Sequence, residues 1–312
     1  MTQTVLLKVD NLKQHFKVGR KQWIRAVDGV SFEIYEGETF SVVGESGSGK
    51  STLGRSIIRI YDASEGTVEF LNKNISGNLN KDLRQYLSSN MQMIFQDPMA
   101  SLNPRKKVLD TVAYGLDVNG LAKKDREQKV SDVLESVGLS SDFMTRYPHQ
   151  FSGGQRQRIG IARALILEPK FIIADEVISA LDVSIQAQVI NLMKKLQKDH
   201  GLTYMFIAHD LSMVRSISDR IAVMHLGHIV ELGTVDDIYN NPVHPYTKSL
   251  LSSVPIPDPD KERSRTRVSY VKGETNYNTA KIHHLNDTHQ VLADDDELEF
   301  WLSGDYGTTL VG

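Results

Sequence analysis

Short, almost uninterrupted apolar runs recur along this chain and predict the strands of a parallel sheet. Residues 39–43, 171–174 and 204–208 are the clearest of these runs. A strand that is apolar on both faces is typical of a parallel sheet covered by helices on both sides. The pattern therefore indicates an α/β fold. Further strands are expected at 67–71, 91–95, 220–224 and 228–232.

Helical periodicity lies between these runs and is clearest at 184–198, where Ile185, Val189, Met193 and Leu196 recur on one helical face. The helices expected between about 97 and 165 interrupt the alternation of strand and helix. We therefore expect an α/β core that carries a helical insertion over 97–165. The other expected helices are 50–61, 108–118, 126–137, 153–167 and 235–239.

Both ends of the chain follow a different pattern. Near the N-terminus, strands are expected at 6–9, 26–27 and 30–35, with a basic stretch at 17–25 between them. After Asn241 prolines crowd a short segment and polar residues then dominate to the end. For 260–312 the composition leaves a structured appendix and a partly disordered tail equally open.

Length, charge and composition argue against several classes of function. The chain has 312 residues, which suffices for a large core, and its net charge of −3 gives no indication of nucleic-acid binding. No apolar run approaches the roughly 20 residues that span a bilayer, and the N-terminus lacks an export signal pattern. The absence of cysteine excludes disulfides and cysteine-ligated metal centres and is compatible with the cytosol.

A glycine-rich loop directly follows the apolar run 39–43 and precedes the expected helix at 50. Glycines let backbone N–H groups point inward at phosphates, and the helix start adds its positive dipole end. Lys50 would supply charge to the β- and γ-phosphates of a nucleotide, and the Ser51 hydroxyl is placed to bind magnesium. The candidate nucleotide-binding residues are Gly44, Glu45, Ser46, Gly47, Ser48, Gly49, Lys50, Ser51 and Thr52.

Polar residues at three other strand ends would provide the remaining groups needed to hydrolyse a bound nucleotide. Asp175 ends a buried strand, where it could bind magnesium, and Glu176 beside it could act as general base toward water. His209 closes the run 204–208, and because the two strand ends are expected to be neighbours, we predict that it contacts the γ-phosphate. Gln96 follows the run 91–95 and suits a magnesium or water contact.

A second glycine-rich segment opens the helix expected at 153. Serine caps a helix, and bare glycine amides leave an anion site at its start. The segment consists of Ser152, Gly153, Gly154 and Gln155, preceded by Phe151. Read locally, it is equally well a capped helix with a basic, solvated face.

Together these segments resemble the ATP-binding cassette (ABC) transporter ATPases. They match, in order, the Walker A motif (44–52), the Q-loop (96–98), the signature (151–155), Walker B (171–176), the D-loop (179–182) and the switch histidine, His209. The resemblance covers roughly 1–240. The segments 101–105, 151–165 and 243–247 are similar to the oligopeptide and dipeptide importer branch, and 252–259 resembles its F-type ATPase subunits.

The resemblance implies a P-loop NTPase core (an ABC ATPase domain, 1–240) with an antiparallel β subdomain, the helical insertion and a C-terminal extension (241–312) that is partly irregular. It implies ATP and Mg²⁺ as ligands, with Ser51, Gln96 and Asp175 on the metal. Lys50, Glu176 and His209 would be catalytic. An aromatic side chain would stack on adenine: Phe16 by its position, with Trp23 as the alternative.

The same resemblance implies partners. Two such ATPases dimerise head to tail, so 152–155 would contact the γ-phosphate held by a paralogous D-type ATPase subunit. Two membrane permeases and an extracytoplasmic peptide-binding protein would complete the complex, with the surface around Gln96 and the helical insertion receiving the permeases. The chain would then lie at the cytoplasmic side of the cell membrane as a peripheral subunit that drives oligopeptide uptake, without binding nucleic acid.

One departure and several alternatives remain. Val177 stands where the family usually has proline, which predicts a looser link between Walker B and the D-loop. The same ATPase could serve dipeptide, nickel or glutathione import. A soluble ABC ATPase without membrane partners, and a regulatory subunit with a degenerate site, are the other hypotheses. His283, His284 and His289 are interpreted as part of a solvated tail rather than as a metal site.

Overall fold

The computed structural model describes residues 4–97, 101–120, 125–179, 181–254, 270, 277 and 279–303. Its centre is an eight-stranded sheet with the order β11-β12-β10-β9-β3-β8-β7-β6. The five strands from β9 to β6 run parallel, whereas β9, β10, β12 and β11 pair antiparallel in turn. The strands are β3 (Thr39–Val43), β6 (Met91–Ile94), β7 (Phe171–Asp175), β8 (Thr203–Ala208), β9 (Arg220–His225), β10 (His228–Thr234), β11 (Lys281–His284) and β12 (Gln290–Ala293).

The parallel strands are confirmed almost residue for residue, because burial on both faces makes their apolar runs continuous. Every residue of β3, β7 and β8 is buried. One hydrophobic cluster, which includes Val43 and Ile172, lies on the side of α7 (Gly153–Leu165) and α8 (Val183–His200). A second, which includes Val42, lies between the two sheets. The central sheet is thus covered on both sides.

The N-terminal segment forms a second, antiparallel sheet with the order β2-β1-β4-β5. The predicted strands 6–9, 26–27 and 30–35 are shorter than the observed ones. The first lies within β1, the other two lie within β2, and the basic stretch 17–25 forms the hairpin between them. Several irregularities in the β1–β2 register interrupt the two-residue alternation, so the sequence pattern shows only fragments of these strands. The strands are β1 (Val5–Lys17), β2 (Trp23–Tyr35), β4 (Glu65–Phe70) and β5 (Lys73–Asn74).

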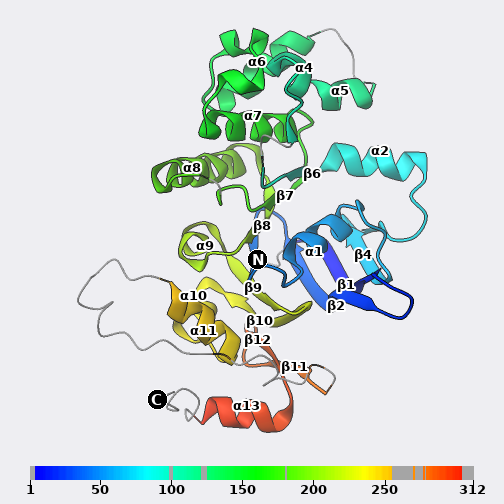
Figure 1. Cartoon of the computed structure of the whole chain (residues 1–312), viewed down its shortest axis with the longest axis vertical. Helices are drawn as coiled ribbons and strands as arrows, with labels where there is room; N and C mark the ends of the chain where they lie inside the picture. The colour runs from blue at the N-terminus through cyan, green and yellow to red at the C-terminus, as the bar shows by residue number, and fades with distance from the viewer. Residues whose placement is uncertain are drawn as a thin grey trace.

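Helices gather at one end of the molecule, where α4, α5 and α6 lie on the far side of α7 from the central sheet (Figure 1). The predicted helix 108–118 is two short helices that meet at Ala113, and the predicted helix 50–61 ends at Ile57. Sequence periodicity missed α2 and α9. The remaining helices of this part are α1 (Lys50–Ile57), α2 (Lys81–Asn90), α4 (Val108–Val112), α5 (Tyr114–Val118), α6 (Arg126–Ser136) and α9 (Leu211–Ile217).

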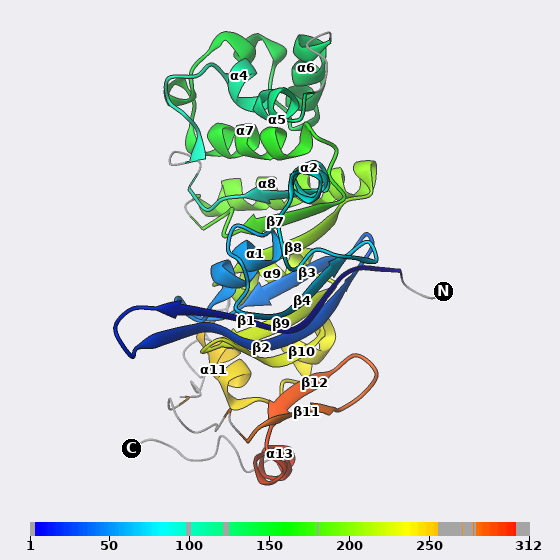
Figure 2. The same ribbon diagram turned by 90° about the vertical axis from the view of Figure 1, so that its right-hand side faces the viewer.

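The C-terminal extension is structured over much of its described length. Helix α10 (Val235–Asn240) precedes the extension, in which α11 (Pro245–Ser253) and α13 (Asp295–Leu302) accompany β11 and β12. Strand β12 pairs with β10, so the central sheet continues across the predicted boundary at 240. In Figure 2 the β1–β2 hairpin lies between α1 and these C-terminal strands. Most of 255–280, and everything after 303, lies outside the described residues.

The interpretation of the tail histidines as part of a solvated tail is wrong for His289, which Glu231 holds in the core. His289 is buried, and its Nε2 atom lies 2.8 Å from the buried carboxylate of Glu231 on β10. That carboxylate also accepts the backbone N–H groups of Val243 and His244. Within the described residues no group of three or more metal-ligating side chains is found. The Glu231–His289 pair therefore holds the extension against the core.

Candidate active site

Two glycines of the P-loop are required by their surroundings. Gly44 has φ 153°, and a Cβ atom there would lie 2.1 Å from the carbonyl oxygen of Met224. Gly49 has φ 109°, and its Cβ would lie 2.0 Å from the carbonyl oxygen of Ala26. The loop is therefore pressed against the end of β9 and against β2, and only glycine fits at both contacts.

Lys50 is the first residue of α1 and points back into the loop. Its Nζ atom donates hydrogen bonds of 2.8 Å to the carbonyl oxygens of both Gly44 and Glu45. Its exposed fraction is only 4%. Burial lowers the pKa of Lys50, although the carboxylates of Glu176, Asp175 and Glu45 act in the opposite direction. The ammonium group is thus held where phosphate oxygens could replace the two carbonyls.

The next residue, Ser51, meets Walker B. Its Oγ atom donates a 2.7 Å hydrogen bond to Asp175, whose exposed fraction is 1%. Burial raises the pKa of Asp175, against the effects of this hydrogen bond and of Arg55, 3.6 Å away. A hydroxyl and a carboxylate side by side fit Mg²⁺, which prefers oxygen ligands and is bound in such sites by one or two protein groups. Ser51 and Asp175 could therefore hold the metal.

Glu176 lies at the meeting point of three strand ends. Its Oε2 atom accepts a 2.8 Å hydrogen bond from the side-chain amide of Gln96 and lies 3.7 Å from Nδ1 of His209. Gln96, Glu176 and His209 lie together because β7 pairs with β6 on one side and with β8 on the other. Glu176 itself has φ 48°, an uncommon conformation for a residue other than glycine. Its backbone N–H donates to the carbonyl of Ile207, which fixes this turn.

A cavity of about 420 Å³ opens between the P-loop and these side chains. Gly47, Lys50 and Ser51 line it from one side, with Gln96 and Glu176 also on its wall. Another part of the wall was not predicted from the sequence, because none of its residues belongs to a motif that indicates ligand binding. These wall residues come from the β1–β2 hairpin and from the turn after β9. They are Ile24, Arg25, Ala26, Leu226 and Gly227.

The two adenine candidates lie on this hairpin. Phe16 pairs in register with Ile24, which lines the cavity, and its ring contacts Tyr61 edge-on at 5.3 Å. Trp23 pairs with Lys17 and is 58% exposed. Neither ring is among the described residues that line the cavity. The role of Phe16 therefore stays a prediction.

The signature lies apart from this cavity. Ser152 caps α7, accepting the N–H of Gln155, while the Gln155 side chain accepts the N–H of Ser152. Gly154 faces α8, since a Cβ there would lie 2.8 Å from Ile185. Among the described residues, none of 152–155 lines the P-loop cavity. One chain thus brings together Lys50 and the strand-end residues, but not the signature.

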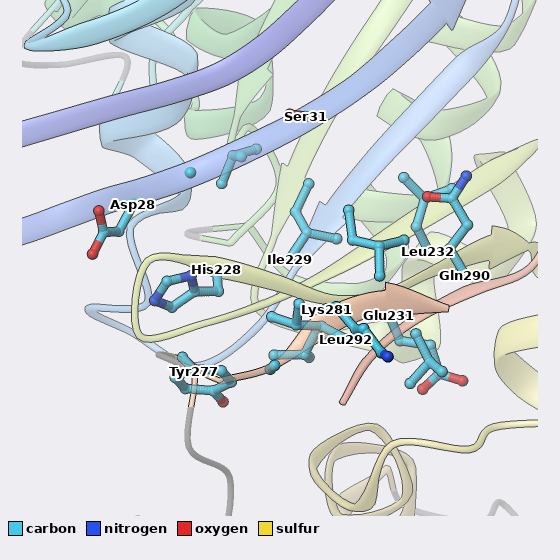
Figure 3. A pocket seen from close by; sticks show the side chains of 16 residues that line it. Asp28, Ser31, His228, Ile229, Glu231, Leu232, Tyr277, Lys281, Gln290 and Leu292 are labelled. Atoms are coloured by element: carbon cyan, nitrogen blue, oxygen red, sulfur yellow. The ribbon is translucent and has the colours of Figure 1, made fainter. Parts of the chain in front are cut away.

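Two other hollows lie elsewhere. One, of about 280 Å³, separates β2 from β10 and β12 and is lined by Asp28, His228, Tyr277 and Lys281 (Figure 3). It contains no part of the P-loop. The other is a groove of about 1090 Å³ beside Gln96, formed by α2, α5 and the end of α1. Within the described residues, no helix combines the length and apolar character needed to cross a bilayer.

Comparisons with known proteins agree with this geometry. Residues 27–179 match the family described as ABC transporter, and 230–280 match the C-terminal region of oligopeptide/dipeptide transporters. The oligopeptide transport ATP-binding protein OppF of Bacillus subtilis is 61% identical over 85% of this chain and 87% of its own length. OppF of Streptococcus mutans is 57% identical over 94% and 96%. The dipeptide transport ATP-binding protein DppF of Lactococcus lactis is 56% identical over 85% and 86%.

Solved structures give the same fold. The dimeric ATP-binding cassette MJ0796, in a post-hydrolysis state with ADP and Pi, superposes with a TM-score of 0.67 at 30% identity, over 74% of this chain and 99% of that one. The cassette cbiO1 from Clostridium perfringens, part of the ABC transporter complex cbiONQ, gives a TM-score of 0.68 at 27% identity, over 76% and 92%. Each superposition leaves about a quarter of this chain uncovered.

Proposed function

This chain belongs to the ABC transporter family, in the branch of oligopeptide and dipeptide transport ATP-binding proteins, and on that premise we propose that it hydrolyses ATP to power the uptake of oligopeptides across the cytoplasmic membrane. The observation that carries the proposal is the convergence of Lys50, Gln96, Asp175, Glu176 and His209 on one edge of the sheet. Dipeptides are the second candidate substrate, supported by the 56% identity to DppF.

The side chains divide the reaction between them. The P-loop amides and Lys50 bind the β- and γ-phosphates and take up charge that develops on them. Glu176 accepts a proton from the water that attacks the γ-phosphate, and the amide of Gln96 positions that carboxylate at 2.8 Å. His209, next to Glu176, contacts the γ-phosphate. The products are ADP and inorganic phosphate.

Magnesium has a place in this arrangement. Ser51 and Asp175 would hold Mg²⁺, and Gln96 would reach it with its amide oxygen, which its hydrogen bond to Glu176 leaves unused. When bound, the ion would neutralise charge on the β- and γ-phosphate oxygens. The protein's own contribution is a buried carboxylate, held by Ser51 and Arg55, that a cation would stabilise.

The absence of the signature from the chain's own cavity supports a composite site. We expect Ser152, Gly153, Gly154 and Gln155 to meet the γ-phosphate bound by a second ATPase, while a signature from that ATPase covers this P-loop. The dimeric state of MJ0796 with ADP and Pi supports such an arrangement. A paralogous D-type subunit is the proposed second ATPase.

Membrane permeases are the partners of an oligopeptide transport ATPase, and the groove beside Gln96 suits them. It exposes the apolar side chains of Ile60, Tyr114 and Val118 next to arginines, and it ends at the Q-loop. We propose that cytoplasmic segments of two permeases bind there and hold the chain at the inner face of the membrane. An extracytoplasmic peptide-binding protein would deliver the substrate.

The test is the Glu176→Gln variant in the complex reconstituted in proteoliposomes. MgATP should still bind with an affinity within about threefold of the wild type, whereas ATP turnover and peptide uptake should both fall by a factor of about 100 or more. The control is Glu69→Gln on the exposed face of β4, in the N-terminal sheet outside both the P-loop cavity and the groove, which should change neither. Near-normal turnover in Glu176→Gln would remove Glu176 as the base, and ATP hydrolysis without peptide uptake in the wild type would reject the transport function.

A further inference from the structure

The segment 243–247, singled out in the sequence, has a defined place in the fold. His244 precedes α11, and its Nδ1 atom accepts the backbone N–H of Tyr246 at 3.1 Å. Pro245 occupies the first turn, where its missing N–H costs nothing. The start of α11 is thereby fixed, and the Tyr246 side chain is turned inward with an exposed fraction of 2%.

The hydroxyl of Tyr246 reaches the P-loop. It accepts a 2.9 Å hydrogen bond from the backbone N–H of Glu45, across 201 positions of sequence. The carbonyl oxygen of Glu45 in turn accepts a 2.8 Å hydrogen bond from the Lys50 ammonium group. Glu45 is therefore held from two sides, by the extension at its N–H and by the catalytic lysine at its C=O.

Aromatic side chains connect this contact to the wall of the nucleotide cavity. The Tyr246 ring lies 4.2 Å, between centroids, from His225 at the end of β9. The hydroxyl of Tyr277 hydrogen-bonds His225, and its ring stacks on His228 at 4.6 Å (Figure 3). The turn between β9 and β10 lines the nucleotide cavity at Gly227, whose N–H donates to the carbonyl of Ser48 in the P-loop. The extension thus contacts the P-loop directly through Tyr246, whereas Tyr277 contacts His225 and His228, neither of which lines the nucleotide cavity.

A nucleotide would change the balance of these bonds. When Lys50 turns to phosphate oxygens, it gives up the carbonyls of Gly44 and Glu45. The bond from Glu45 to Tyr246 does not depend on Lys50 and can persist in both states. Burial raises the pKa of Tyr246, so its hydroxyl stays neutral and keeps this acceptor role.

We propose that Tyr246 is a positioning residue, through which the C-terminal extension holds the P-loop in its phosphate-binding shape and sets the affinity for nucleotide. The inference rests on the proposed ATP binding at this loop and goes beyond it, since it gives the extension a part in the ATP site. A loop that is preorganised binds more tightly, because less of its population must change shape on binding. By reciprocity, bound nucleotide stabilises α11.

The experiment compares two variants that each remove one hydroxyl from the same aromatic cluster. Tyr246→Phe keeps the buried ring but deletes the bond to Glu45, whereas Tyr277→Phe deletes the bond to His225 and leaves Glu45 untouched. MgADP binding is measured by calorimetry on the full chain, and steady-state ATPase kinetics on the reconstituted complex. For Tyr246→Phe we expect about tenfold weaker MgADP binding and a raised KM, with kcat within about twofold. Tyr277→Phe should change both by less than about twofold.

Hydrogen exchange supplies a readout that does not depend on activity. In the wild type, MgADP should slow amide exchange in 245–253, and in Tyr246→Phe this protection should disappear. Unchanged affinity in a folded Tyr246→Phe protein, or equal losses in both variants, would overturn the inference. Failure of the wild type to bind MgADP would instead reject the proposed function, so the two failures are distinguishable.

Discussion

At the scale of single residues, the turn after Walker B holds Val177, where the resemblance to the family implies proline. Glu176 adopts a left-handed backbone conformation, and its carbonyl accepts the N–H of Ser179 at 3.1 Å. Val177 occupies the second position of this turn, where proline is favoured because its ring fixes φ. The valine is also buried in the core beside α8. Hydrophobic packing therefore holds a turn that proline would hold through the backbone.

This difference gives the first prediction. Val177→Pro should stiffen the link between Glu176 and the D-loop, which lowers the amount of ATP hydrolysed per peptide transported while kcat changes less than about threefold. We expect the free energy of unfolding to change by less than about 1 kcal/mol, because the gain in chain entropy opposes the loss of valine packing. The measurement is the ratio of ATPase to uptake in proteoliposomes. An unchanged rate and an unchanged ratio would discard the idea.

At the scale of elements, the start of α11 depends on a neutral histidine. The His244 side chain is fully buried, caps α11 with Nδ1, and packs against Trp301 of α13 at 4.8 Å. Its Nε2 atom has no hydrogen-bond partner among the described residues. Burial, reinforced by His225 and Lys248, lowers the pKa of His244 from 6.5 to about 3. The folded protein thus resists protonation of this side chain, whereas the unfolded chain does not.

The second prediction follows from the sign of that shift. Between about pH 3 and pH 6.5 the unfolded state binds one more proton at His244, so this residue removes stability as the pH falls, by up to about 1.4 kcal/mol per pH unit. Above pH 6.5 its contribution is constant. His244→Asn keeps a capping acceptor for α11 but does not titrate. Its free energy of unfolding should be lower at pH 7.5, yet decline less steeply on acidification.

Urea denaturation at pH 5.0, 6.0 and 7.5 provides the measurement. The comparison needs only the difference between the two proteins, since the other histidines are common to both. Parallel pH curves for the wild type and His244→Asn would contradict the assignment of a neutral, buried His244.

At the scale of the whole molecule, the P-loop and the signature lie in different parts of the fold. The P-loop lies between the sheets, whereas α7 carries the signature in the helical group at the end of the molecule (Figure 1). A Cβ at Gly153 would be 3.7 Å from Leu181, an ordinary contact, so a side chain can be introduced there without disturbing the fold. The proposed composite site can therefore be tested by substituting each of the two segments separately.

The third prediction uses this separation. In the isolated chain, Gly153→Asp should leave MgATP affinity within about twofold, because the signature does not line its own cavity. In the complex, the same substitution should reduce ATPase activity at least tenfold, because the new carboxylate would repel the γ-phosphate bound by the second ATPase. Lys50→Ala is the opposite case and should lose binding in the isolated chain. Calorimetry and ATPase assays check both statements, and loss of MgATP binding in isolated Gly153→Asp would contradict the split site.

Several parts of the site could be predicted because each depends on a local pattern. A strand buried on both faces produces a continuous apolar run, so the ends of β3, β7 and β8 could be located and their polar residues identified. Glu176 and His209 were expected to be neighbours on that basis, and they are 3.7 Å apart. The glycines of the P-loop carry an equally local signal, since their positive φ angles favour glycine at these positions.

Other parts could not be predicted, because their reasons lie in distant segments. The irregular β1–β2 register hides most of the hairpin that supplies Ile24 and Arg25 to the cavity. Strand β12 is short and is held by Glu231 and His289, whose separation of 58 positions leaves no periodic trace. Helix α13 is held where Trp301 packs against His244, which is similarly distant in sequence. Local propensity cannot reveal such contacts.

By itself, the sequence determined the chemistry of this protein: a phosphate-binding loop, a carboxylate pair and a histidine at the ends of buried strands, in an order that identifies the family. Only the tertiary structure decided how that chemistry is supported, bringing Tyr246 to the backbone of Glu45 and leaving the signature away from its own P-loop. The physical reason is that side-chain identity and strand burial are written in neighbouring residues, whereas a hydrogen bond across 201 positions arises only when the whole chain is packed.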